Sequence, residues 1–190
     1  MDQITAPKAA IVDLLHLPRP GVLQLDPAHS IGDLHVRHAL WGAQRITLIP
    51  LRGLLQTSLE GALAVELSLR TAHAPDRRKP GPAGVGTGPE TIRFTSTNGV
   101  RRVDANVYEL AGDLAMGSVT GALTLRIRDL GWMAANGRGR RHLLALSASL
   151  PREFWRWSVT ARQTGWMLEH EAKLFLHTEW VPASGVKPAA

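Results

Sequence analysis

The histidines are the first residues of this chain whose type and spacing could do chemistry, by binding a metal ion. His29, His35 and His38 are expected to lie in one extended, strand-like segment. His35 and His38 are three residues apart, so on a strand they point to opposite faces. His29 and His35 share a face, but about 20 Å of extended chain separates them, which is too far for one ion. The spacing predicts no metal site.

Arrangements that serve catalysis are also missing from the sequence. His170 lies between Glu169 and Glu171, and on a strand its ring faces away from both carboxylates. The glycine-rich stretch 84–88 lacks both spacings of a phosphate-binding loop, and Pro89 stops the helix that would follow. Without cysteines there is no thiol nucleophile and no cysteine–zinc site. We identify no catalytic residues, no metal ligands and no cofactor, which favours a binding protein over an enzyme.

Six tryptophans stand against one tyrosine and three phenylalanines. Trp155 and Trp157 are two residues apart and share one face if the segment is extended. Two interpretations stay open. The rings either brace the interior of the fold or form an aromatic wall for an apolar ligand.

The elements that must position these residues are short segments with period-two hydrophobicity, separated by glycine-containing turns such as Asn98-Gly99. We expect strands over 22–26, 31–38, 45–51, 63–71, 91–96, 107–113, 122–129, 142–149, 154–159 and 171–181. Many short strands at regular intervals indicate an antiparallel sandwich or barrel. The alternation of strands and helices that a doubly wound sheet needs is missing. The predicted fold class is all-β.

Apolar and polar residues alternate strictly within several of these segments. Phe94, Leu123, Leu125, Ile127 and Leu146 are expected to face the interior, and Arg93, Arg126 and Arg128 to face solvent. A closed barrel of about eight strands has an interior that side chains just fill, or that holds one small ligand.

We divide the chain into an N-terminal arm (1–21) with a short helix, a barrel domain (22–182) and a flexible tail (183–190). The stretch 74–89 holds four prolines and four glycines and is expected to be a long loop, either a functional lid or a disordered segment. Arg77 and Arg78 lie within it.

Composition narrows the partners of the protein. The chain has 190 residues, 44% of them hydrophobic, and a net charge of +6. The basic clusters lack interleaved aromatic residues, so we expect no nucleic-acid partner. No apolar run approaches the roughly 20 residues of a membrane helix, and no secretory pattern opens the sequence. We therefore expect a cytoplasmic protein, and a homodimer stays open.

Several segments of the sequence form a recognisable set in their order and spacing. They are Leu25–Ser30 with Val36–His38, Thr91–Thr97, Tyr108–Thr120 continuing through Leu125, and Ser147–Val159. Together they resemble the YceI-like family of lipid- or polyisoprenoid-binding domains, and the Gly112-Asp113-Leu114-Ala115 stretch is similar to the most recognisable hairpin of that family. The matching segments cover nearly all of 22–181.

The resemblance implies an eight-stranded, lipocalin-like antiparallel barrel around an apolar tunnel for an isoprenoid quinone or polyprenyl compound. The residues expected to line the ligand are Leu34, Val36, Phe94, Leu123, Leu125, Ile127, Leu146, Trp155 and Trp157. A polar head group would then pair at the mouth with His38, Arg77 or Arg78. Two alternatives stay open: a cyclase or isomerase of a natural-product pathway that uses the cavity, and a structural barrel without a ligand.

Overall fold

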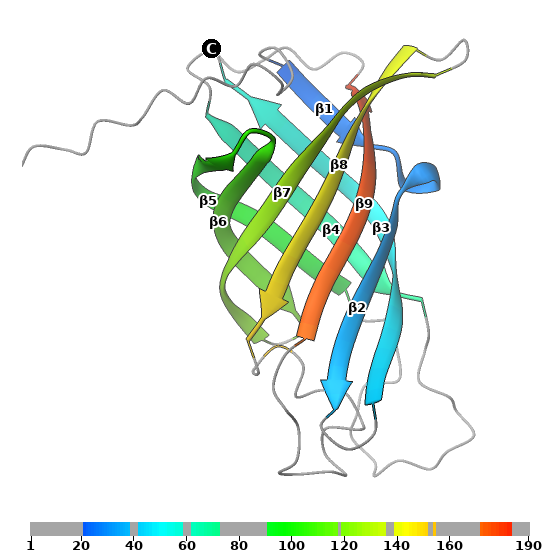
Figure 1. The fold of residues 1–190 in the computed structure, drawn as a ribbon, viewed down its shortest axis with the longest axis vertical. Helices are drawn as coiled ribbons and strands as arrows, with labels where there is room; N and C mark the ends of the chain where they lie inside the picture. The colour runs from blue at the N-terminus through cyan, green and yellow to red at the C-terminus, as the bar shows by residue number, and fades with distance from the viewer. Residues whose placement is uncertain are drawn as a thin grey trace, which may run out of the picture.

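A computed structural model describes residues 21–38, 42–58, 62–72, 91–117, 119–135, 139–151, 154 and 172–183. These residues form strands and one short 3-10 helix, η1, which confirms the all-β prediction (Figure 1). The elements are β1 (Gly21–Leu25), η1 (Pro27–His29), β2 (Ile31–His38), β3 (Gly42–Thr57), β4 (Leu63–Thr71), β5 (Thr91–Asp104), β6 (Val107–Met116), β7 (Val119–Ala135), β8 (Gly139–Leu150) and β9 (Ala172–Pro182).

The strands close into an antiparallel barrel. Each strand from β3 to β9 pairs with its successor in the chain where described, and the remaining sides of β3 and β9 are joined through β1 and β2. β1 and β2 share one position in the wall, because both pair with β3 on one side and with β9 on the other. Among the described residues the wall therefore has eight positions, which confirms the predicted eight-stranded barrel.

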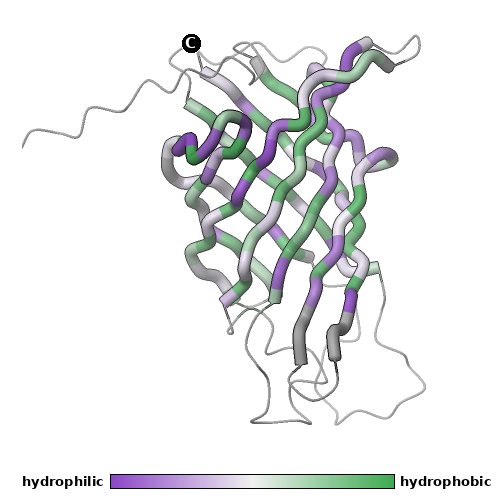
Figure 2. Tube along the Cα trace, in the orientation of Figure 1, coloured by the Kyte–Doolittle hydropathy of each residue, from purple (hydrophilic) through white to green (hydrophobic). Residues whose placement is uncertain are grey.

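The interior of the barrel is built by strict alternation along each strand, as Figure 2 shows by the change of hydropathy from residue to residue. In β4, Leu63, Val65, Leu67 and Leu69 are buried. The same alternation in β7 buries Leu125 and Ile127 and exposes Arg126 between them. Alternation places one face of the sheet in the core and the other in solvent, so the sequence pattern determines which way each strand faces.

The break between β1 and β2 is held by charged side chains. Asp26 Oδ1 accepts a hydrogen bond from the Ala28 N–H at 3.1 Å, and Asp26 Oδ2 lies 2.9 Å from His29 Nδ1. Arg141 Nη1 is 3.0 Å from Asp26 Oδ2 and 2.5 Å from Glu179 Oε2. Burial alone would raise the pKa of Asp26, but the hydrogen bond from His29 and the charge of Arg141 outweigh it and lower this pKa. The network fastens η1 to β8 and β9.

At the upper end in Figure 1, a bulge in β7 creates a buried polar pair. The register with β8 shifts between Asp129 and Gly131, and Gly131 has a φ of +89° that favours glycine. Asp129 Oδ1 accepts from the Gly131 N–H at 2.7 Å and lies 2.8 Å from His142 Nε2. The His142 ring stacks on the Trp132 ring with centroids 4.7 Å apart. The Arg140 guanidinium lies 5.3 Å from the Trp132 ring centroid.

Three sequence-based expectations about local structure are wrong. Asn98-Gly99 is not a turn: β5 runs through it with an irregular register between Ser96 and Val100. The chain reverses instead at residues 105–106. The sequence signal at Gly99 is ambiguous because a glycine inside a strand can mark a bulge as well as a turn. His29 lies in η1 rather than in a strand. Phe154 lies in a 3-10 turn, its N–H donating to the Pro151 carbonyl at 3.0 Å, and the rest of the strand predicted over 154–159 lies outside the described residues.

Close packing of the interior predicts a strong effect at Gly112. A Cβ atom there would lie 2.5 Å from Phe94 Cζ and 2.5 Å from the Thr95 carbonyl oxygen, whereas a Cβ at Gly99 would meet nothing within 4 Å. Gly112→Ala should lower the free energy of unfolding in urea by about 1–3 kcal/mol. Gly99→Ala is the matched control and should change it by less than about 0.5 kcal/mol. Equal effects of the two substitutions would contradict the packing.

The network at η1 predicts an acid-dependent contribution to stability. The pKa of Asp26 in the folded protein is lowered below its ordinary value of 3.8. Its stabilising effect is therefore fully present above that value and is lost as the pH falls through the lower folded pKa. The difference in unfolding free energy between the natural protein and Asp26→Asn should be constant above about pH 5 and shrink below about pH 4. Urea denaturation from pH 7 down to acid conditions measures it, and a difference that grows on acidification would contradict the assignment.

Candidate functional site

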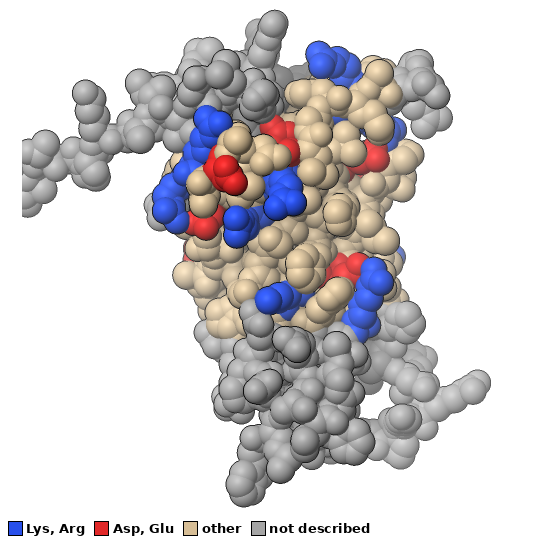
Figure 3. Space-filling view, viewed as in Figure 1, with Lys and Arg blue, Asp and Glu red and all other residues tan. Residues whose placement is uncertain are grey.

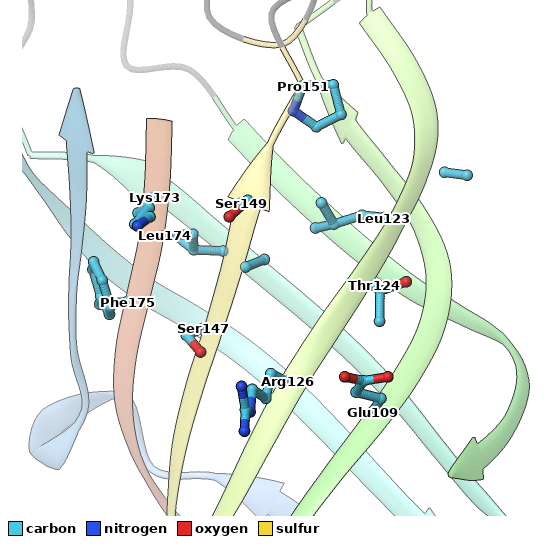
Figure 4. Close-up of a pocket in the computed structure, with 12 residues that line it drawn as sticks. Glu109, Leu123, Thr124, Arg126, Ser147, Ser149, Pro151, Lys173, Leu174 and Phe175 are labelled. Atoms are coloured by element: carbon cyan, nitrogen blue, oxygen red, sulfur yellow. The ribbon is translucent and has the colours of Figure 1, made fainter. Parts of the chain in front are cut away.

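The barrel wall is incompletely paired between β7 and β8. These strands pair from Arg126↔Ser147 up to Ala135↔Gly139, and below Arg126 the two strands are not paired with each other. In contrast, β6–β7 and β8–β9 pairing continues to the lower end. A hollow of about 620 Å³ lies at this place, lined by residues of β6, β7, β8 and β9 and by Pro151. We call it the β7–β8 hollow (Figure 4).

The hollow has an apolar part made of inward-facing residues. Leu123, Ala148 and Leu174 line it and also belong to the hydrophobic core. Leu123 and Ala148 are 6% and 7% exposed, more than any other residue of that core cluster. The hollow therefore reaches side chains of the interior through the wall. Below it, Phe154 is fully buried, and a Cβ added at Gly121 would lie 2.9 Å from its ring.

The rim of the hollow is polar and basic. Ser147 and Ser149 on β8 face outward, with Arg126 beside Ser147 on β7 and Lys173 beside Ser149 on β9. Figure 4 shows Arg126 and Lys173 on either side of the two serines. Glu109 also lines the hollow but forms an ion pair with Arg101.

The outer face above the hollow continues this pattern. A second hollow of about 280 Å³ shares Arg126, Ser147 and Phe175 with the first and adds Arg128 and His177. Phe175 is 37% exposed, and its ring centroid lies 5.1 Å from that of His35. Figure 3 shows this side of the molecule, where basic and acidic side chains are interspersed over the upper part of β5–β7 and again in a separate group lower down.

A second group of polar side chains lies inside the upper end of the barrel, away from the hollow. Tyr108, Asp129 and His142 are buried, and the Tyr108 hydroxyl, Asp129 Oδ2 and His142 Nδ1 lack hydrogen-bond partners among the described residues. Burial raises the pKa of Tyr108, the charge of Asp129 raises it further, and Arg102 partly offsets both effects. This group connects the β7 bulge to β8, and neither hollow includes any of its members.

Metal chemistry has no visible support within the described ranges. No group of three or more His, Asp and Glu side chains there is arranged to hold a metal ion. The arrangement of the β7–β8 hollow, an apolar floor below a rim of hydroxyls and cations, suits an elongated molecule with one apolar and one polar end.

The structure places many of the predicted interior residues where the alternation puts them. Arg93, Arg126 and Arg128 are exposed, as expected. Buried, inward-facing positions are confirmed for Leu34, Phe94, Leu123, Leu125, Ile127 and Leu146. Of these six, only Leu123 lines the larger hollow and only Leu146 the smaller one. Their contact with a ligand stays a prediction.

The other predicted site residues cannot be assigned a side-chain environment. Val36 and His38 lie in the last part of β2, which ends at the lower end of the barrel, and nothing is described of their side chains. Trp155, Trp157, Arg77 and Arg78 lie outside the described residues. So do nearly all of the predicted arm, whose last residue Gly21 begins β1, and nearly all of the predicted tail.

Sequence reasoning missed the residues that make the rim. Arg126 was expected only to face solvent, and Lys173, Ser147 and Ser149 were not singled out. The available signal was the alternation Ser147-Ala148-Ser149, which combines small outward hydroxyls with a small inward residue. The partners across three strands depend on register, which no local pattern of this chain specifies.

Comparison with known proteins supports the fold. No family model matches the chain, and no curated protein matches its sequence. The crystal structure of BcnA from Burkholderia cenocepacia superposes with a TM-score of 0.56 at 12% identity, covering 82% of this chain and 98% of that one. This similarity shows a common barrel fold, and function must be argued from the site.

The fold and the hollow together define a small closed β-barrel with a ligand-sized recess in its wall. The apolar residues that line this recess are compatible with an apolar ligand. No helix in the described part of the chain has the length and apolar character needed to cross a lipid bilayer.

Disulfide trapping tests the incomplete pairing of β7 and β8. The natural chain has no cysteine, so engineered pairs are unambiguous. Arg126→Cys with Ser147→Cys places two cysteines at directly paired positions and should form a disulfide readily on oxidation. Thr124→Cys with Ser149→Cys, two residues lower on each strand, should form it poorly, because Cα atoms more than about 7 Å apart cannot be bridged without backbone movement. Mass spectrometry of the oxidised proteins measures both, and equally fast closure of the two pairs would show that the wall is not open.

Proposed function

We propose that the protein binds an isoprenoid-chain lipid, such as an isoprenoid quinone or a polyprenyl compound, through the β7–β8 hollow. The observation that carries the proposal is a recess that joins outward polar residues to the inward-facing Leu123, Ala148 and Leu174. The resemblance of several sequence segments to the YceI-like family supplies the isoprenoid class.

The size and character of the hollow support this proposal. Its volume of about 620 Å³ falls within the range of roughly 300–1,000 Å³ that is usual for ligand pockets. Each methylene moved from water onto an apolar surface contributes about 0.8 kcal/mol. A chain on Leu123, Ala148 and Leu174 therefore gains affinity without directional contacts, and the polar rim accepts the head group.

Packing of the described interior favours partial rather than complete insertion of the chain. Trp180 of β9 is fully buried, and its ring reaches Gly53 of β3. A Cβ atom added at Gly53 would lie 2.9 Å from the Trp180 ring and 2.9 Å from Leu67, so little space is left there. The same density supports the competing account, a structural barrel without a ligand. Binding at the hollow separates the two accounts, because the structural barrel predicts no saturable binding.

The test blocks the rim from outside without altering the core. Ser149→Trp places a large ring at an exposed, outward position on the rim, and Thr95→Trp places the same ring at an exposed position on β5. In calorimetry with a short-chain isoprenoid quinone, Ser149→Trp should weaken binding at least about tenfold, while Thr95→Trp should match the natural protein. Binding by the natural protein should also show a negative heat-capacity change from apolar burial.

Two results would contradict the proposal. If the natural protein shows no saturable binding of isoprenoid ligands, the structural barrel becomes the better account. If binding is saturable but insensitive to Ser149→Trp, the ligand binds elsewhere on the molecule.

A further inference from the structure

We infer that the free edge of β7 at the upper end of the barrel, residues 130–135, pairs with the same edge of a second copy of this chain. This edge is the side of β7 that faces away from β8. The inference does not depend on the proposed function, because neither hollow includes any of these residues.

The upper part of β7 lacks a strand neighbour on one side. β6 begins at Val107, which pairs with Arg128. One further hydrogen bond joins the Asp129 N–H to the Asn106 carbonyl. Above that bond no described strand pairs with β7 on the β6 side, whereas β8 pairs with residues 131–135. Figure 1 shows this hairpin projecting past the upper end of the wall. Unpaired backbone N–H and C=O groups on such an edge are a template for another strand.

The composition of this edge differs from that of a comparable edge on β5. Leu130 and Met133 are 50% and 44% exposed, and residues 130–135 include no charged residue. β5 also continues past the end of its pairing with β4, but its residues 101–104 include two arginines and an aspartate. Charged side chains on an edge strand oppose pairing with another chain. The β5 edge is therefore protected, and the β7 edge is open.

The described cations of the hairpin do not occupy this edge. Arg140 and Arg141 belong to β8, one strand away from it. The Arg141 guanidinium contacts Asp26 and Glu179, and the Arg140 guanidinium lies against the Trp132 ring. The edge thus combines apolar side chains with open backbone groups. Such backbone groups are costly in lipid, where no water satisfies them, so another strand is a better occupant than a bilayer.

A second copy fits the edge because the sequence of the edge complements itself. Antiparallel pairing of an edge with its own copy is two-fold symmetric, and it must bring side chains of the same face together. With the axis at Met133, this residue faces its own copy. Trp132 then faces Ala134 of the second copy, and the small side chain leaves room for the ring. The last pair, Gly131 with Ala135, lies at the bulge, above the part of β7 that β6 covers.

Charge substitution at the two-fold axis tests the pairing. Sedimentation equilibrium of the natural protein should show monomer and dimer in proportions that depend on concentration. Met133→Lys places like charges directly opposite each other and should weaken the dimer at least about tenfold, as should Met133→Glu. An equimolar mixture of these two variants should associate again, because the opposed charges then attract. Val103→Lys is the matched control, since Val103 is also 44% exposed but lies on the β5 edge. It should leave the equilibrium within about twofold of that of the natural protein.

A cysteine at the axis tests the register, because the natural chain has no cysteine. Directly opposed residues of an antiparallel pair have Cα atoms about 4.5–5.5 Å apart, which a disulfide can bridge. On oxidation, Met133→Cys should form a covalent dimer, and Val103→Cys should remain mostly monomeric. Unfolding in urea confirms that each variant is folded before its association is measured.

Several results would overturn the inference. A natural protein that stays monomeric up to its solubility limit lacks the interface. A dimer that Met133→Lys and Val103→Lys weaken equally, or that neither weakens, uses another surface. A mixture of the lysine and glutamate variants that fails to associate, or a Met133→Cys variant that fails to crosslink, contradicts the axis. Binding to anionic lipid vesicles by a monomer, lost in Met133→Lys, would mean that the hairpin docks on a membrane instead. Each of these results leaves the proposed function standing, because Met133 and Val103 line neither hollow.

Discussion

Closure of one β-sheet on itself is the constraint on which the rest of this structure depends. The ring is completed by two strand segments, β1 and β2, which share one position between β3 and β9. A closed sheet must keep its strands tilted and its register staggered, so one strand segment need not span the full height of the wall. Where β1 ends and β2 begins, the η1 network around Asp26 and Arg141 holds the two segments in place.

The same stagger explains the hollow. β7 pairs with β8 from the hairpin downward, through the bulge at Asp129, and the last pair is Arg126↔Ser147. Seven residues of β7 continue below that pair, 119–125, against three of β8, 148–150. Both strands stay paired on their other sides with β6 and β9. The wall therefore remains stable while a recess forms between the two strands, with core side chains at its base and outward polar side chains at its rim.

Much of this architecture could be predicted from local pattern, because alternation is a local property. It correctly put Phe94, Leu125 and Ile127 in the core and Arg93, Arg126 and Arg128 outside. Local pattern failed at Asn98-Gly99, where the glycine lies in an irregular stretch of β5 and not in a turn. A glycine in a bulge and a glycine in a turn look alike in sequence. The rim is beyond local reasoning altogether. Arg126 and Lys173 are separated by 46 residues of sequence, and only the long-range register of three strands brings them to one recess. The buried Asp129–His142 pair has the same origin, because the bulge turns what reads as the end of a strand into an interior carboxylate.

Photocrosslinking maps the bound chain directly and is the sharpest test of the claim that the recess between β7 and β8 receives it. An isoprenoid carrying a diazirine at its chain end would be irradiated with the natural protein, and the modified peptides identified by mass spectrometry. The account predicts adducts on Leu123, Ala148 and Leu174, which excess unlabelled isoprenoid removes. Adducts confined to the opposite wall, on the outward residues of β3–β5, would contradict it.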